Sequence, residues 1–308
     1  MNKLDRKNLV CVLGPTGVGK SRISLRLAKT FGGEIINCDS MQVYKGFDIG
    51  TDKIAPSVRQ KIPHHLIDIK SPWEQFTAAE FARLSLEAAE DILKRGLLPI
   101  ITGGTGLYFS ALFNGLFPEG QKDPSVRTKL EAEFRKKGLE SLRQRLEEID
   151  PGISQRISPN DKIRIIRALE VFETTGIPMS HHFQKTRSFV EDYFVLKIGL
   201  ILERDLLVKK IEKRVDRMFE RGIIQEVQTL LDSGISSHVP AFRALGYKHV
   251  LNFLNGKTTK EEAVLLMKQD TRRYAKRQKT WFRKMKGIRW FSPKEFRPIR
   301  EYIEKNLK

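Results

Sequence analysis

Short runs of apolar residues recur along the chain and are typical of strands that a sheet buries on both faces. These runs occupy residues 9–13, 34–38, 98–102 and 194–202. Amphipathic helical stretches separate the first three runs, as they do in a parallel sheet that helices cover on both sides. The pattern therefore predicts an α/β fold built around a parallel sheet.

The pattern changes in the middle of the chain, where apolar runs disappear and amphipathic helical stretches follow one another between prolines and glycines. The helices expected there cover residues 125–136, 139–149 and 161–174. Because the run at 194–202 resumes the sheet pattern, we expect an all-helical insertion rather than a second α/β domain. We place this insertion domain at residues 121–187 and the core domain at residues 1–120 and 188–308.

The longest predicted helix lies near the end of the chain and is strongly basic. The helices expected outside the insertion cover residues 21–30, 76–95, 206–221, 223–233 and 260–286. In the last of them, Tyr274 and Trp281 recur at helical spacing and are expected to be core residues. Nine Lys or Arg and no acidic residue lie between Thr271 and Trp290. This basic stripe is either solvated or bound to phosphates.

A glycine-rich segment directly follows the first apolar run and precedes a helix. It fits the pattern G-x-x-x-x-G-K-[ST] and consists of Gly14, Pro15, Thr16, Gly17, Val18, Gly19, Lys20 and Ser21. Such a turn points successive backbone N–H groups at phosphate oxygens, and the helix N-terminus adds its partial positive charge. We expect Lys20 to reach the outer phosphate and the Ser21 hydroxyl to bind Mg²⁺. The segment therefore predicts a site for a di- or triphosphate.

Composition narrows the class of protein. The 308 residues carry a net charge of +19, which favours a polyanionic partner, most often a nucleic acid. No apolar run approaches the ~20 residues that a membrane span needs. The two cysteines, Cys11 and Cys38, both lie in strand-like runs, which argues against a disulfide framework or a zinc site. We expect a cytoplasmic protein without a membrane segment.

An acidic residue follows a strand at the edge where the phosphate loop is expected. ATPases and GTPases normally carry an acid at the end of a second strand, where it holds Mg²⁺ through water. The run at 98–102 ends instead in Gly103 and Gly104, whereas the run at 34–38 is followed by Asp39. Ligands bind at this carboxyl edge of a parallel sheet. Asp39 can therefore hold Mg²⁺, act as a base on a second substrate, or cap the following turn.

Five segments, taken in order, resemble the tRNA dimethylallyltransferase family. They are residues 14–21, 39–51, 63–68, 103–108 and 271–283. The resemblance covers nearly the whole chain, which is similar to bacterial members because the zinc-finger extension of eukaryotic members is not found. It implies a P-loop NTPase-like sheet and transfer of a dimethylallyl group from dimethylallyl diphosphate to the exocyclic amine of an adenosine. That adenosine lies on the 3′ side of the tRNA anticodon, and the phosphate loop would hold the diphosphate leaving group with Mg²⁺ on Ser21.

The resemblance also implies roles for individual residues. Asp39 matches the general base that takes the amine proton, and Arg243 matches an arginine on the diphosphate, with a surface salt bridge as its alternative. With Lys20 and Ser21 they are the expected catalytic residues. The expected contacts with the anticodon stem-loop are Asp39, Ser40, Met41, Gln42, Thr105, Arg127, Ile163, Arg164, Ile165, Ile166, Arg167, Arg272, Arg273, Lys276 and Arg277. The acceptor base must leave its stack to react, so the helical insertion is expected to grip the stem-loop.

Three other functions stay open at this point. They are prenylation of a free adenine nucleotide, phosphate transfer by a small-molecule or nucleotide kinase, and an NTP-gated RNA-binding module without catalysis. The insertion and the basic helix argue against the first, the order of the motifs against the second, and Asp39 against the third. The histidine pairs at 64–65 and 181–182 lack accompanying acids or cysteines, so we expect no metal there and place His65 near the floor of the active site. We expect a monomer that binds tRNA, dimethylallyl diphosphate and Mg²⁺.

Overall fold

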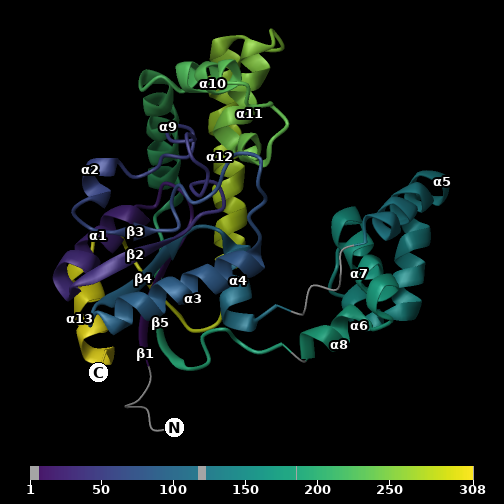
Figure 1. Ribbon diagram of the computed structural model, residues 1–308, viewed down its shortest axis with the longest axis horizontal. Helices are drawn as coiled ribbons and strands as arrows, with labels where there is room; N and C mark the ends of the chain where they lie inside the picture. The colour runs from purple at the N-terminus through teal and green to yellow at the C-terminus, as the bar shows by residue number, and fades with distance from the viewer. Residues whose placement is uncertain (1–6, 117–122, 185, 308) are drawn as a thin grey trace. The chain divides into compact units, whose positions relative to one another are not determined.

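The protein divides into two compact units, and the computed structural model describes residues 7–116, 123–184 and 186–307 of it. One unit combines Met1–Ser110 with Val190–Lys308, and the other consists of Ala111–Phe189. The larger unit contains the sheet, whereas the described part of the smaller unit is helical (Figure 1). The chain therefore leaves the sheet-containing unit once and later returns to it.

Within the described residues, a six-stranded sheet forms the centre of the larger unit. In spatial order its strands are β3 (His64–His65), β2 (Gly33–Cys38), β4 (Leu98–Gly103), β1 (Lys7–Leu13), β5 (Tyr193–Leu200) and β6 (Ile288–Phe291). Every neighbouring pair is parallel. The predicted α/β class with a parallel sheet is thus confirmed, as are the four predicted strands. The edge strands β3 and β6 had no counterpart in the predicted pattern.

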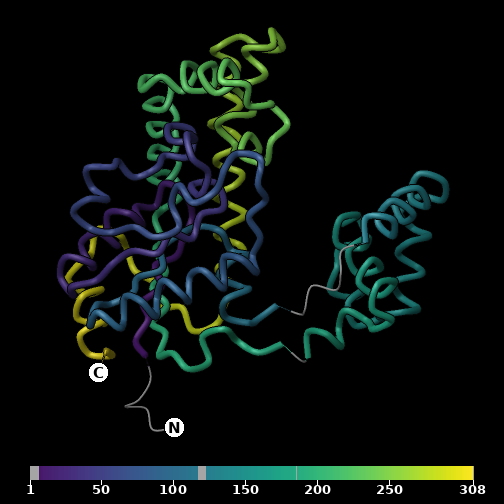
Figure 2. Tube along the Cα trace, viewed as in Figure 1, coloured from purple at the N-terminus to yellow at the C-terminus, as the bar shows by residue number. Residues whose placement is uncertain are grey.

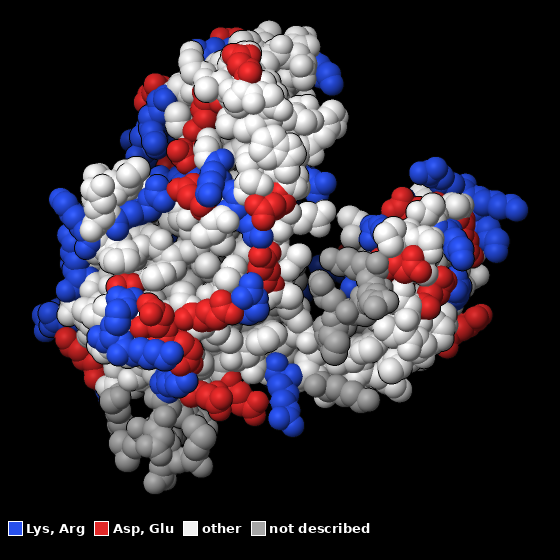
Figure 3. Space-filling model, viewed as in Figure 1, with Lys and Arg blue, Asp and Glu red and all other residues white. Residues whose placement is uncertain are grey.

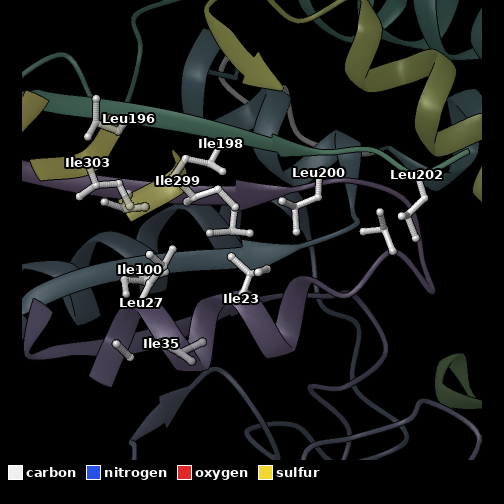
Figure 4. Close-up of a cluster of buried hydrophobic side chains, with 14 of the residues drawn as sticks. Ile23, Leu27, Ile35, Ile100, Leu196, Ile198, Leu200, Leu202, Ile299 and Ile303 are labelled. Carbon is white, nitrogen blue, oxygen red and sulfur yellow. The ribbon is translucent and has the colours of Figure 1, made fainter. Parts of the chain in front are cut away.

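One face of the sheet is covered by α1 (Lys20–Phe31) and α13 (Phe296–Asn306), and α13 was not predicted. Figure 4 shows this core, which includes Ile23, Leu27, Ile35, Ile100, Leu196, Ile198, Leu200, Ile299 and Ile303. All of these side chains are almost completely buried. Burial of apolar surface stabilises a fold by about 25 cal/mol per Å². The helix that follows the phosphate loop is therefore fixed firmly against the sheet.

The remaining helices include four that build a second core. In chain order, the helices that accompany the sheet besides α1 and α13 are α2 (Pro56–Arg59), α3 (Ala78–Lys94), α4 (Gly106–Asn114), α9 (Arg204–Glu220), α10 (Ile223–Asp232), α11 (Leu245–Leu254) and α12 (Lys260–Arg283). The last four of these, α9–α12, build the second core. Val43 and Phe47, from the loop after β2, pack with Met218 and Tyr247 of α9 and α11. Figure 2 shows this loop lying beside the green helices. The second core therefore attaches the loop after Asp39 to α9–α12.

Besides the end of α4, the described helices of the smaller unit are α5 (Pro124–Ile149), α6 (Pro151–Ser154), α7 (Lys162–Thr175) and α8 (Met179–Gln184). Gly138, at φ 81°, interrupts α5, so two helical segments follow one another as predicted. Leu146, Ile165 and Leu169 lie in the core of this unit. Apolar faces of α5 and α7 thus hold the unit together.

The side chain of His65 takes part in an ionic cluster beside β2. Its Nε2 is 2.7 Å from Oε2 of Glu34, near the start of β2, and neither cavity of the site described below includes it. Glu34 also pairs with Arg95, which precedes β4, and this guanidinium lowers the pKa of Glu34 to about 2. The His65 side chain thus contacts Glu34 and does not line either cavity, whereas the next residue, Leu66, accepts from Asn37 of the inner cavity. The histidine belongs to an ionic cluster at the opposite, amino-terminal edge of the sheet.

Candidate active site

The phosphate loop lies between the end of β1 and the start of α1, as the sequence predicts. Gly14, Gly17 and Gly19 have φ angles of 151°, 77° and 105°, which side-chain-bearing residues rarely adopt. A Cβ on Gly14 would also lie only 2.7 Å from the carbonyl oxygen of Leu200. Glycine is therefore required at these positions, and α1 begins with its N-terminus at the loop.

Lys20 is the most strongly perturbed cation of the site. Its Nζ donates to the carbonyl oxygens of Gly14 and Pro15 at 2.9 and 3.0 Å. Burial lowers its pKa to about 8, with the charge of Asp39 opposing the shift and that of Arg214 adding to it. Burial disfavours the charged form of a lysine, and a nearby anion restores it. An anionic ligand would therefore stabilise the charged form of Lys20.

Asp39 follows β2 at the carboxyl edge of the sheet. Its Oδ1 accepts from the backbone N–H of Met41 at 2.9 Å and of Gln42 at 3.4 Å, so the turn-capping role is real. The residue nevertheless lines a cavity together with Lys20 and Ser21. One oxygen orients the carboxylate, and the other is available to a ligand.

The carboxyl end of β4 cannot carry an acidic residue, because there is no room for a side chain at Gly103. A Cβ on Gly103, at the end of β4, would lie 1.9 Å from the carbonyl oxygen of Cys38. Close contact with β2 therefore imposes glycine where ATPases and GTPases place their magnesium-holding acid. Asp39, which directly follows β2, instead supplies an acid at the carboxyl edge of the sheet.

Two adjoining cavities of the larger unit meet at the phosphate loop. The inner cavity, of about 280 Å³, is lined by Asp39, Ser40, Met41, Gln42 and Arg243, among others. The outer cavity, of about 760 Å³, is bordered by Gly17, Gly19, Arg22, Lys210, Lys213 and Arg217, among others. Both are lined by Lys20, Ser21, Asp52 and Arg214. A basic outer chamber thus opens beside an inner chamber that contains the candidate base.

Arg243 lies at the end of a short 3₁₀ segment, Pro240–Arg243, and lines the inner cavity. No carboxylate in the described part of the chain pairs with it. The surface salt bridge considered from the sequence is therefore not what the structure contains. An unpaired cation at this wall suits an anionic substrate group.

Several residues of the site were not foreseen, Arg214, Gln278 and Tyr274 among them. Arg214 of α9 donates to Thr16 Oγ1 at 2.8 Å and pairs with Asp52 at 3.3 Å. Gln278 of α12 accepts the Thr16 N–H through Oε1 and donates to Gly104 O through Nε2, both at 2.8 Å. Tyr274, expected in the core, lines the inner cavity. The Thr16 N–H, expected to contact the diphosphate, is thus already bonded to Gln278.

Several expected RNA contacts have other neighbours. Ile165 and Ile166, expected in the tRNA-contacting stretch, are each only 1% exposed, and their side chains fill the core of the smaller unit. Ile163, in contrast, is 72% exposed. Thr105 does not line the inner cavity, and its Oγ1 accepts from the Ser40 N–H at 3.2 Å.

The expected basic contacts divide into paired and unpaired side chains. Within the smaller unit, Arg167 and Arg127 pair with the buried carboxylate of Glu170 at 3.0 and 3.6 Å, and Arg164 pairs with Asp161. These arginines thus also stabilise their own unit. Figure 3 shows Lys and Arg over the visible face of both units with Asp and Glu among them.

On α12, Arg272 pairs with Glu212 and Arg273 with Asp270. The exposed Lys276 and Arg277 have no carboxylate partner among the described residues. Trp281, expected in the core, is 37% exposed, and a Cβ on Gly106 would lie 2.5 Å from its ring. This helix thus presents free cations and an aromatic ring on its surface.

The phosphate loop, the adjacent carboxylate and the unpaired arginine together form a candidate active site at the carboxyl edge of an α/β sheet. Residues 42–285 match the model of the IPP transferase family, and the chain belongs to this family. No helix in the described part of the chain is long and apolar enough to cross a membrane.

Named relatives match over nearly the whole chain. A tRNA dimethylallyltransferase of Geobacter sulfurreducens is 46% identical over 286 residues, which cover 93% of this chain and 92% of the relative. One of Carboxydothermus hydrogenoformans is also 46% identical, with 92% of each chain covered.

Solved structures are similar as well. The tRNA isopentenylpyrophosphate transferase of Bacillus halodurans matches with a TM-score of 0.72 and 41% identity, covering 98% of this chain and 97% of that one. A eukaryotic dimethylallyltransferase, described as acting on tRNA, matches with a TM-score of 0.81 and 32% identity, covering 96% of this chain and 78% of that one. Both agree with the α/β architecture described above.

Proposed function

We propose that this protein transfers a dimethylallyl group from dimethylallyl diphosphate to the exocyclic amine of the adenosine 3′ to the anticodon of tRNA. The bond between the allylic carbon and the diphosphate oxygen breaks, a carbon–nitrogen bond forms, and the amine loses a proton. The observation that carries the proposal is the position of Asp39, which lines the same small cavity as the phosphate-loop residues Lys20 and Ser21. The names of the relatives support the choice of both substrates.

The diphosphate is best placed against the residues shared by the two cavities. Negative charge grows on the diphosphate as the carbon–oxygen bond breaks, and fixed positive groups stabilise that charge. Lys20, Arg214 and Arg243 supply the cations, and the start of α1 supplies backbone N–H groups. The Thr16 N–H donates to Gln278 and the Val18 N–H to Pro15 O at 3.4 Å, so the amides at the start of α1 are the ones that would meet phosphate oxygens.

Asp39 is best suited to accept the amine proton. An adenine amine is a weak nucleophile, and a positioned base typically contributes about 10²–10⁴-fold to such a step. The hydrogen bonds from Met41 and Gln42 hold one carboxylate oxygen in place. The inner cavity would then receive the flipped base, with Gln42 on its wall.

Mg²⁺ fits the oxygen donors at the junction of the cavities. Mg²⁺ commonly takes one or two protein oxygens and fills its other positions with water and substrate phosphates. The Ser21 hydroxyl and the Asp52 carboxylate both line the two cavities. No cluster of three or more His, Cys, Asp or Glu that could hold a metal ion occurs in the described residues. Ser21 and Asp52 would hold the ion, which when bound would neutralise charge on the diphosphate.

RNA would be held by basic side chains of both units. Lys276, Arg277 and the exposed Trp281 of α12 offer phosphate contacts and a stacking surface. In the helical unit the exposed Ile163 and Arg164 are the strongest candidates. We propose that residues 121–187 act as the tRNA-contacting domain of a monomeric, cytoplasmic enzyme.

Replacing Asp39 with asparagine tests the proposed base. The Asp39→Asn side chain keeps an oxygen for the Met41 N–H but cannot accept a proton, so we expect turnover to fall by about 10²–10⁴-fold. Binding of an anticodon stem-loop should be largely kept. Transfer is measured as radiolabelled dimethylallyl incorporation under single-turnover conditions.

Asp216→Asn is the matched control, because Asp216 lines the outer cavity and pairs with Lys268 at 2.6 Å. It should leave the transfer rate close to that of the unaltered protein. An Asp39→Asn protein that retains full turnover would show that the carboxylate is not the base.

A further inference from the structure

Glu226, in the first turn of α10, holds one segment of the loop that follows β2. Its Oε2 accepts from the backbone N–H of Asp48 at 3.0 Å and of Ile49 at 2.7 Å. Its Oε1 accepts from the N–H of Gly50 at 3.2 Å and from the Tyr247 hydroxyl at 2.6 Å. One carboxylate thus binds three successive backbone amides, and hydrogen bonds to a charged acceptor are the strong ones.

The segment after these amides is tightly constrained. A Cβ on Gly50 would lie 2.6 Å from the Tyr247 ring, so the loop contacts α11 directly. Asp52 has a φ of 54°, in the left-handed region that Asp adopts more readily than most other non-glycine residues. The buried ammonium of Lys53 donates to Tyr44 O and to the carboxylates of Asp48 and Asp68 at 2.6–2.8 Å. The carbonyl groups of residues 51 and 52 are therefore held in fixed positions.

These two carbonyl groups set the orientation of the Gln42 side chain. Gln42 Nε2 donates to Thr51 O at 3.1 Å and to Asp52 O at 3.5 Å. The hydrogen bond to Thr51 O thus directs the amide nitrogen of Gln42 toward these carbonyl groups. No donor among the described residues reaches Oε1, and Gln42 lines the inner cavity. Gln42 therefore offers the cavity an acceptor rather than a donor.

We propose that Glu226 is a positioning residue that makes Gln42 select an acceptor base by its amine. The inference rests on the proposed function, since it requires that the base enters the inner cavity. The 6-amino group of adenine donates to a carboxamide oxygen, whereas the 6-oxo group of hypoxanthine or guanine presents a second acceptor to it. When the 6-oxo group faces Gln42 Oε1, no hydrogen bond forms between them, and both oxygens lose their contact with water. The loop geometry thus rejects oxopurines.

The test is the affinity for two anticodon stem-loops that differ only in the acceptor base, adenosine or inosine, in which an oxo group replaces the 6-amino group and N1 carries a hydrogen. Binding is measured without dimethylallyl diphosphate, so no reaction intervenes. The unaltered protein should prefer the adenosine hairpin by about tenfold. Glu226→Gln puts an amide N–H against backbone N–H groups, frees the 48–52 segment, and should reduce this preference to about twofold or less. Gln42→Met should do the same.

Glu262→Gln is the matched control, because Glu262 also accepts a backbone N–H, that of Thr259, but belongs to the N-terminal cap of α12. It should lower stability without changing the preference, which as a ratio of affinities does not depend on the folded fraction. Glu226→Asp, whose shorter carboxylate cannot reach all four donors, replaces the glutamine variant if that variant does not fold, and it should also lower the preference.

An unchanged preference in the Glu226 variants, or none in the unaltered protein, overturns the inference. Transfer to the adenosine hairpin, measured in parallel, reports on the proposed function separately: transfer without a base preference would refute only the role of Glu226 and Gln42.

Discussion

Lys20 shows how strongly the fold tunes a single residue. Its ammonium lies at the junction of the two cavities, where partial burial lowers its pKa to about 8. The proton is thus held less firmly than by an exposed lysine, whose pKa is about 10.4. A bound diphosphate stabilises the charged form, so ligand binding and protonation of Lys20 are linked.

The linkage predicts the pH dependence of diphosphate binding. Because Lys20 is charged below its pKa and neutral above it, affinity for inorganic diphosphate should fall as the pH rises through about 8. Binding should take up protons in that range, which calorimetry in two buffers of different ionisation enthalpy measures. Lys20→Arg, which stays charged, is the control and should show a shallower fall. An affinity that is the same at pH 7 and pH 9 in both proteins would contradict the assignment.

The site residues that the sequence identified are those that a short local motif marks. Asp39 and Ser21 follow strands or loops with a recognisable pattern, and the inner cavity brings them together. Arg214, Gln278 and Glu226 were missed because their partners lie 198, 262 and 177 positions away in the chain. Nothing in the local pattern of an amphipathic helix distinguishes such a side chain from a solvated one.

At the scale of elements, long segments were predicted well and short ones were not. The interior strands and the helix at 260–283 carry enough residues for an apolar pattern to stand out. Strands β3 and β6 have two and four residues, too few for any periodicity to be detected. Trp281 was misplaced because an aromatic residue at helical spacing also fits a half-exposed position against a glycine.

Helix α12 links the diphosphate loop to the proposed RNA surface. Gln278 faces the phosphate loop, whereas Lys276 and Arg277 are exposed on the same turns. If these two side chains neutralise phosphates, each substitution by glutamine should weaken binding of the stem-loop and reduce the salt slope by about one. Fluorescence anisotropy over a range of salt concentrations measures both quantities.

Arg297→Gln is the control for the two α12 variants. Its exposed guanidinium is already paired with Glu301 and lies on α13, which packs with α1 against the sheet. This variant should leave the slope unchanged. Equal slopes for all three variants would show that the free cations of α12 are merely solvated.

At the scale of the whole molecule, the basic residues behind the net charge of +19 lie in both units, and some of them pair with carboxylates of their own unit. Part of it is used inside the helical unit, where Arg127 and Arg167 neutralise Glu170. Total charge, which the sequence supplies at once, therefore indicates a polyanionic partner but does not show which cations are free to contact it. Only pairing and burial, which depend on the fold, separate the two groups.

Nucleoside mass spectrometry on unmodified tRNA is the most direct test of the proposed activity. The tRNA is incubated with the protein, Mg²⁺ and dimethylallyl diphosphate, and a parallel reaction contains ATP instead. We predict a dimethylallyl mass gain on one adenosine that requires dimethylallyl diphosphate and is indifferent to ATP. Consumption of ATP without any mass gain on the tRNA would contradict the account and return the phosphate loop to phosphate transfer or nucleotide sensing.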